Sequence, residues 1–274
     1  GKLFDPQLGV NDLKNKNIKF IGDPQKRIEE DYLRIIRFIR FKIMYDFKIE
    51  QTTAKAIKQN LNGIKKISKE RILIELYKIF DLKNFCYLND SIDLKEIFTL
   101  IFPEFENLYR LERLNKICNY SQLNKTLLLA TLLLDEKNSH EYFCHKYNVS
   151  NLTKDSLNLF AKNLKIIREN KAFFNKDLEK NIYLNNKNHL INLNILNFVL
   201  NNKLKIKDFS LILKSILKSK THKLSIDGKY LMDNGMLQGA LIGKVLKKVE
   251  EEWLKNDFKI TKSRVKEIIK QFST

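Results

Sequence analysis

The stretch from Gly22 to Phe41 reads GDPQKRIEEDYLRIIRFIRF, and its periodicity decides the fold class of this chain. Apolar residues recur in it at the spacing of an amphipathic helix, which we predict to run from about Glu29 to Tyr45. The apolar face of this helix consists of Tyr32, Leu33, Ile36, Ile39 and Ile43. Helical periodicity continues to the C-terminus, so we expect an all-α fold.

Arginines gather on the polar face of the same helix. Four of the nine arginines of the chain lie in this stretch, although lysine carries most of the other positive charge. At about 100° per residue, the polar face combines Arg27, Glu30, Asp31, Arg34 and Arg37, with Arg40 near its edge. Arginine presents a planar fork of donors that lysine lacks, so this choice indicates recognition of a planar or anionic group.

The composition limits the class of protein. The chain has 274 residues, 43% of them hydrophobic, with only eight glycines and three prolines, which argues against a hairpin-rich β protein and against a disordered chain. A net charge of +19 favours a polyanionic partner such as nucleic acid. A coding bias toward lysine explains the same charge, so the assignment depends on particular residues.

Several other classes are disfavoured. The longest apolar run, Leu127 to Leu134, is far shorter than the roughly 20 residues that span a bilayer, and no signal peptide is visible, so we expect no membrane association. Three cysteines without a C-x-x-C pair indicate a reducing compartment, and we expect a cytoplasmic protein. His140 and His145 lie off the spacing that places two metal ligands on one helix face, and we assign no metal ligand.

The rest of the chain divides into a short mixed start and a series of helices. IKFI, residues 18–21, predicts a short strand. We expect one helix over residues 52–61, one that begins after Ser68, and one that opens at Pro103. Further helices are expected over residues 121–135, 152–168, 190–200 and 206–219.

Glycines recur every fourth residue near the C-terminus, at Gly235, Gly239 and Gly243. Two interpretations stay open. Small residues there permit close approach of an RNA backbone to a helix N-terminus, or they permit close helix packing beneath Leu241 and Val245, for which this spacing is common.

The polar face of the arginine helix has the donor and acceptor order that reads a base. The Asp31 carboxylate is suited to accept from an exocyclic amine while the Arg34 guanidinium donates to the adjacent ring nitrogen. Cytosine and adenine offer that order, whereas guanine and uracil offer the reverse and leave polar groups unpaired. A second interpretation is structural, because Arg27 with Asp31 and Glu30 with Arg34 are ordinary i, i+4 ion pairs.

The motifs of this region resemble those of the class II tRNA nucleotidyltransferases, the CCA-adding enzymes, and of the related bacterial poly(A) polymerases. The glycine-aspartate-proline element matches Gly22 to Pro24 together with Arg27, and the E-D-x-x-R motif matches Glu30, Asp31 and Arg34. Arg37 and Arg40 follow as in the family, and the S-x-E-R motif falls on Ser68 to Arg71. The resemblance extends to the C-terminal segment GKYLMDNGMLQGALIGKVLKKVEEEW and is weak between about residues 82 and 220.

The resemblance implies a fold, substrates and partners. The fold is a curved helical molecule, with a β remnant of the catalytic head at residues 1–22, a neck at 23–81, a body at 82–155 and a tRNA-binding tail at 156–274. The activity is addition of C and A to the tRNA 3′ end, with CTP and ATP as substrates, tRNA as partner and Mg²⁺ as cofactor. The implied nucleotide-binding residues are Arg27, Glu30, Asp31, Arg34, Arg37 and Arg40.

The chain departs from the family in one respect. It contains no G-S motif, no D-x-D pair and no R-R-D-F element, which in the family belong to the head that binds two Mg²⁺ ions. We therefore assign no catalytic residue and expect this chain alone to be inactive. A separate head-domain chain is then a further expected partner.

Two alternatives to CCA addition remain. The first is the same portion of a poly(A) polymerase, since the neck motif does not separate the two activities. The second is an RNA-binding remnant without chemistry.

Overall fold

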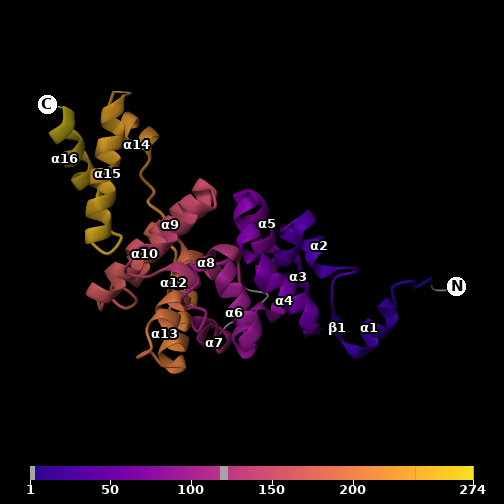
Figure 1. The fold of residues 1–274 in the computed structure, drawn as a ribbon. Coiled ribbons are helices and arrows are strands. Elements are labelled where there is room, and N and C mark those ends of the chain that lie inside the picture. Colours follow the sequence, from indigo (N-terminus) through magenta and orange to yellow (C-terminus); the bar gives the residue numbers. More distant parts are fainter. Residues whose placement is uncertain (1–3, 118–122, 238, 274) are drawn as a thin grey trace. The chain divides into compact units, whose positions relative to one another are not determined.

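A computed structural model of the chain describes residues 4–117, 123–237 and 239–273. Within these residues the fold is all-α, as expected, apart from one two-stranded parallel sheet (Figure 1). The sheet pairs β1 (Asn17–Ile18) with β2 (Lys48–Ile49), in the register Asn17 opposite Lys48. The strand lies earlier than residues 18–21, because Phe20 leaves it to stack on Phe38, with 5.1 Å between ring centroids.

The chain forms two compact units, which we describe separately. The first comprises residues 1–169 and 192–210, and the second comprises residues 170–191 and 211–274. The α12 helix (Lys187–Leu200) and the α13 helix (Ile206–Lys218) each contribute residues to both units. The division into head remnant, neck, body and tail stays a prediction.

Four helices in the first unit carry the residues singled out above: α2 (Pro24–Glu30), α3 (Leu33–Tyr45), α4 (Gln51–Asn60) and α5 (Lys69–Phe80). The α2 helix packs on α4 and α3 packs on α5 (Figure 1). A short 3₁₀ helix, η1 (Leu61–Lys66), joins α4 to α5. Ile36 and Ile39 of α3 and Leu76 and Ile79 of α5 are almost fully buried, as the periodicity predicts.

The prediction of one helix from Glu29 to Tyr45 is wrong. The chain leaves the helical conformation at Asp31, with φ −156° and ψ 103°, so α2 ends at Glu30 and α3 begins at Leu33. The break lets the two helices bury different partners, since Ile28 of α2 and Ile35 of α3 are both 0% exposed. A periodicity without glycine or proline gives no sign of this change of direction.

The remaining elements of the first unit follow α5 along the chain: η2 (Lys83–Asp90), α6 (Ile92–Ile101), α7 (Arg110–Asn115), α8 (Lys125–Leu133), α9 (Ser139–Lys146) and α10 (Asn151–Glu169). Buried aromatic rings form much of the core, with Phe98 and Phe105 stacked at 5.8 Å between centroids. Cys86 and Cys144 are buried and form no disulfide within the described residues, and Cys118 lies outside those residues.

The prediction of a helix that opens at Pro103 is also wrong, because α7 begins seven residues later at Arg110. Tertiary contacts hold the intervening residues in turns. Phe105 is 1% exposed, and the Glu104 carboxylate accepts hydrogen bonds from Lys146 Nζ and Tyr147 Oη. Burial is the main cause that raises the pKa of Tyr147 to about 12, and the negative charge of Glu104 adds to it.

The second unit holds α11 (Leu178–Asn185), α14 (Gly228–Asp233), α15 (Ala240–Lys255) and α16 (Lys262–Ser273). Val245 and Val249 of α15 pack with Val265 of α16 in a fully buried cluster. Among the described residues, close helix packing beneath the recurring glycines is not found, since a Cβ at Gly239 or Gly243 would meet none of their atoms within 4 Å. No described helix has the length and apolarity needed to cross a membrane.

Candidate functional site

The start of α2 is set by Asp23 and Pro24. Asp23 is the N-cap, and its Oδ1 accepts a hydrogen bond from the Gln25 backbone N–H at 2.9 Å. Pro24 occupies the first helical position, where its missing N–H costs nothing. The glycine-aspartate-proline element therefore fixes where α2 begins and where Arg27 falls on it.

Asp31 lies at the break between α2 and α3 and is held from two sides. Its Oδ1 accepts a hydrogen bond from the Leu33 backbone N–H at 3.1 Å, which satisfies one free donor at the start of α3. Its Oδ2 accepts from Arg71 Nη2 at 2.9 Å. The side chain is still 28% exposed, so the carboxylate is fixed in direction and accessible to a ligand.

Arg34 lies in the first turn of α3 and reaches back to α2. Its Nη1 donates to Glu30 Oε2 at 2.5 Å and to the Arg27 carbonyl at 2.7 Å. Arg27 Nη1 donates to the same Glu30 oxygen at 2.7 Å. Within the described residues, Arg34 Nε and Nη2 make no hydrogen bond, so these donors remain available.

Glu30 is the carboxylate shared by these two arginines. The hydrogen bond from Arg34 is the main cause that lowers the pKa of Glu30, and Arg27 adds to it. Glu30 therefore stays ionised and orients Arg34 through Nη1 alone, without using Nε or Nη2.

Arg37 and Arg40 turn instead toward Glu75 of α5. Arg40 Nε donates to Glu75 Oε2 at 3.1 Å, and Arg37 Nε lies 3.5 Å from Oε1. Lys78 Nζ donates to Oε1 at 2.8 Å. Glu75 is 2% exposed; burial alone would raise its pKa, but the hydrogen bond from Lys78 and the charges of the two arginines outweigh burial and lower it.

The structure thus divides the six residues named from the sequence into three sets. The first set is Arg27, Glu30 and Arg34, in which the predicted ion pair of Glu30 with Arg34 is confirmed. Asp31 forms the second set. The prediction that it pairs with Arg27 is wrong, because the extended backbone at Asp31 turns its carboxylate to Arg71. Arg37 and Arg40 form the third set around Glu75.

Sequence reasoning identified the S-x-E-R motif but did not assign contacts to it. Arg71 of that motif holds Asp31, which is 40 residues earlier in the chain. Glu70 Oε1 accepts a hydrogen bond from Asn148 Nδ2 at 2.8 Å, and this contact is the main cause of its lowered pKa. The signal for these contacts was the motif itself, since no local spacing relates positions so far apart.

The resemblance implies Mg²⁺, which clustered carboxylate side chains would hold. Nowhere in residues 4–117, 123–237 or 239–273 do three or more histidine, cysteine, aspartate or glutamate side chains lie close enough together to bind a metal ion. The described residues therefore do not supply the ligands of a two-metal site.

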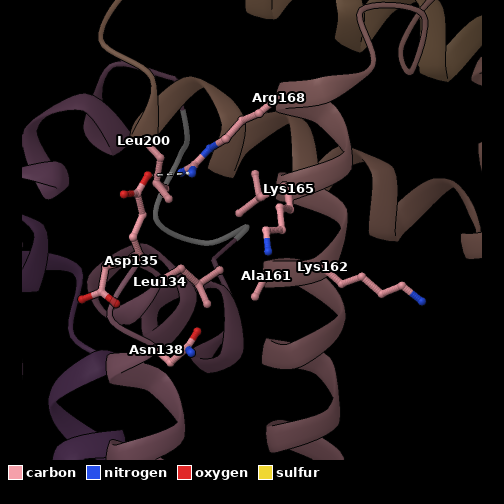
Figure 2. A pocket seen from close by; sticks show the side chains of 10 residues that line it. Leu134, Asp135, Asn138, Ala161, Lys162, Lys165, Arg168 and Leu200 are labelled. Atoms are coloured by element: carbon pink, nitrogen blue, oxygen red, sulfur yellow. Dashed lines mark hydrogen bonds and ion pairs between the residues drawn. The ribbon is translucent and has the colours of Figure 1, made fainter.

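A separate pocket of about 490 Å³ lies between the α8–α9 turn and α10 (Figure 2). Arg168 crosses it to meet Glu136, with Nη1 and Oε1 3.2 Å apart. Lys165 points toward the pocket, whereas Lys162 points away from it (Figure 2). None of the six sequence-predicted residues lines this pocket.

Comparison with known protein sequences supports the resemblance. Residues 46–108 match a family described as "Probable RNA and SrmB- binding site of polymerase A". The chain is 28% identical to a CCA-adding enzyme of Lactobacillus helveticus and 30% identical to one of Lactococcus lactis. These matches cover 92% and 94% of the chain but only 62% and 63% of the relatives, so the chain spans less than two thirds of their length.

Solved structures share the fold. The chain matches a Bacillus stearothermophilus CCA-adding enzyme in complex with CTP at a TM-score of 0.69 and 18% identity, over 98% of this chain and 69% of that one. It matches a Thermotoga maritima CCA-adding enzyme complexed with tRNA at 0.60 and 22% identity, over 96% and 66%. A complex of a CCA-adding enzyme with ATP matches at 0.62 and 23% identity, over 97% and 65%.

The sequence relatives, the family match over residues 46–108 and the shared fold agree with one another. Together they support the class II family of CCA-adding enzymes and bacterial poly(A) polymerases as the family that this chain resembles.

Proposed function

We propose that this chain is the nucleotide-selecting and RNA-binding portion of a tRNA nucleotidyltransferase that adds CCA to tRNA 3′ ends. The observation that carries the proposal is the pair formed by Asp31 and Arg34. Each is partly exposed, each is fixed in direction by hydrogen bonds to neighbouring residues, and each keeps hydrogen-bonding capacity for a ligand.

The pair supports selection of cytosine and adenine. Each oxygen of the Asp31 carboxylate has two lone pairs, and the contacts with Leu33 and Arg71 use one on each. An exocyclic amine is able to donate to a remaining lone pair while Arg34 Nε or Nη2 donates to the ring nitrogen. Guanine and uracil would place acceptor against acceptor at Asp31, a costly mismatch because it leaves polar groups unpaired.

Arg27 and Glu30 support this pair by holding Arg34, and we propose that Arg37 and Arg40 do so from the other side. Both arginines contact the buried Glu75 of the neighbouring helix, which supports an orienting role. Arg37 remains 46% exposed, so a contact from its free donors to a nucleotide phosphate is part of the same proposal.

We propose CTP and ATP as substrates and tRNA as partner, because relatives with these properties share the fold and because the net charge is +19. Transfer itself would use Mg²⁺ held by the carboxylates of a catalytic head domain, as in the family. We propose such a head domain as a partner of these helices and the cytoplasm as the location.

Poly(A) polymerase is the second candidate, because the description of the family matched by residues 46–108 names polymerase A. The two candidates differ in the bases they accept. A poly(A) polymerase has no use for CTP, so comparable affinity for CTP and ATP favours CCA addition.

The experiment is a ligand-observed NMR titration of the purified chain with CTP, ATP, UTP and GTP. We expect CTP and ATP to bind more tightly than UTP and GTP, and Asp31→Ala to abolish the difference. Asp46→Ala is the matched control, because Asp46 is 86% exposed and pairs only with Lys42 in the described residues. Equal affinity for all four nucleotides would contradict the proposal, as would incorporation of labelled CTP or ATP into tRNA by the chain alone.

A salt titration tests the RNA partner. Each lysine or arginine that contacts a phosphate releases counterions, so tRNA affinity should fall steeply with added salt. An affinity that does not change with salt would count against tRNA.

A further inference from the structure

The break between α2 and α3 determines where the proposed base-reading pair lies. Asp31 is the residue with extended backbone at the break, and Arg34 follows in the first turn of α3. Whatever fixes the break therefore fixes the direction of both side chains. Tyr32, which directly follows Asp31, is one of the two variable positions of the E-D-x-x-R motif.

Tyr32 is seated on the backbone of Gly63. A Cβ at Gly63 would lie 2.0 Å from two carbons of the Tyr32 ring, a distance that no real side chain tolerates. Gly63 is buried in η1, and its φ lies outside the left-handed region. The glycine is therefore required by close approach of the ring and not by its own backbone conformation.

Residues 60–66, from the end of α4 through η1, hold both sides of the break. Asn60, the last residue of α4, donates from Nδ2 to Gln25 Oε1 of α2 at 2.7 Å and to the Ala56 carbonyl at 2.9 Å. Lys66 places its ammonium 5.3 Å from the centroid of the Tyr32 ring. Thus α2 is tied at Asn60 and the residue after Asp31 is tied at Gly63 and Lys66.

We propose that Tyr32, seated on Gly63, is a positioning residue that sets the direction of Asp31 and Arg34 toward the incoming base. The proposal rests on the proposed function of that pair. It adds a specificity determinant on η1, a segment that contributes no group to the base itself. The ring supplies the contact, since no described residue hydrogen bonds to the Tyr32 hydroxyl.

The test compares the ratio of CTP to UTP affinity among variants of the purified chain, at a temperature where circular dichroism shows each to be folded. Tyr32→Leu and Gly63→Ala should each reduce the ratio about tenfold, whereas Tyr32→Phe should retain it. In the double variant Tyr32→Leu with Gly63→Ala, the ratio should be no lower than in Tyr32→Leu alone, because the clash has been removed.

Two control variants carry the same chemical changes elsewhere. Tyr142→Leu alters a tyrosine that is 61% exposed on α9, and Gly9→Ala adds a Cβ that meets only ordinary contact at 3.4 Å. Both should leave the ratio unchanged. A merely structural role of Tyr32 would lower the melting temperature of Tyr32→Leu and leave its ratio at the parent value.

The outcomes separate the two proposals. If the parent chain discriminates and folded Tyr32→Leu or Gly63→Ala discriminates equally, the positioning role is overturned while the proposed function stands. Loss of the ratio in Tyr32→Phe would overturn the role of the ring contact. A parent chain without discrimination would overturn the proposed function and the positioning role with it.

Discussion

The four arginines from Arg27 to Arg40 form a row along α2 and α3, and the carboxylates at its two ends lie in opposite environments. At the Asp31 end, the carboxylates are partly exposed and Arg34 keeps unused donors. At the Glu75 end, a carboxylate that is 2% exposed lies under Arg37, Arg40 and Lys78. The comparison shows that burial of the partner, and not the arginine itself, decides whether a contact holds helices together or stays available to a ligand.

The physical reason lies in desolvation. A buried carboxylate without partners is strongly destabilising, so the cations around Glu75 are required for α3 to pack on α5. Exposed ion pairs such as Arg27 with Glu30 contribute little, because water screens them. We therefore expect substitutions at the Glu75 end to change stability and those at the Asp31 end to change selectivity.

The largest expected effect is that of Glu75→Ala on stability. It should lower the free energy of unfolding by about 3 kcal/mol, the lower end for a broken buried pair, because Arg37 and Lys78 still reach water. Urea denaturation gives the measurement. Glu96→Ala, which removes an exposed partner of Lys58, should cost less than about 1 kcal/mol. Equal costs for the two variants would contradict the contrast between buried and exposed carboxylates.

The pH dependence sharpens the same contrast. The cations around Glu75 lower its pKa below the usual 4.5 despite burial, so the ionised carboxylate stabilises the folded state. Its contribution is complete above the unfolded pKa and is lost as the pH falls through the folded pKa. Unfolding measured between pH 6 and about 3 should show this loss in the parent, and Glu75→Gln should show a shallower decline. Parallel curves would refute the assignment.

Asp31→Ala is expected to act on selectivity. Removal of the acceptor should reduce discrimination of CTP from UTP by about 1–3 kcal/mol, the cost of an unpaired polar group. Loss of the hydrogen bond to the Leu33 N–H should cost about 1 kcal/mol of stability, as at a helix cap. Nucleotide titration and urea denaturation measure the two effects. A variant that loses stability but keeps full selectivity would place Asp31 with the structural end of the row.

The smallest expected effect is that of Arg71→Ala. Arg71 is 49% exposed, so its ion pair with Asp31 should contribute less than about 1 kcal/mol to stability, and added salt should reduce that further. The carboxylate remains but is held from one side only, so selectivity should fall less than in Asp31→Ala. Denaturation at low and high salt, combined with the nucleotide titration, tests this. A loss larger than that of Asp31→Ala would mean that Arg71 itself contacts the nucleotide.

Much of the fold follows from local pattern. The apolar periodicity located α3, α5 and α10 within a few residues, because a helix that packs on a core must place apolar side chains on one face. It failed at Asp31 and at Pro103. In both places the backbone leaves the helix to satisfy contacts with residues far along the chain, such as Lys146 with Glu104.

The candidate site divides in the same way. Its residues were identifiable from the E-D-x-x-R and S-x-E-R motifs, and the order of donor and acceptor at Asp31 and Arg34 follows from their chemistry. Their partners were not identifiable. Arg40 meets Glu75 across 35 residues, a separation at which no helical spacing applies.

Side-chain type and local spacing suffice to predict the helical class and the buried faces of the main helices, and they single out the residues that we propose to read a base. The tertiary structure alone decided which carboxylate each arginine meets, where the arginine helix breaks and why position 63 holds glycine. Each of these depends on packing between segments distant in the chain. Burial then decides the strength of a contact, since the cost of removing a charge from water is set by the surrounding fold.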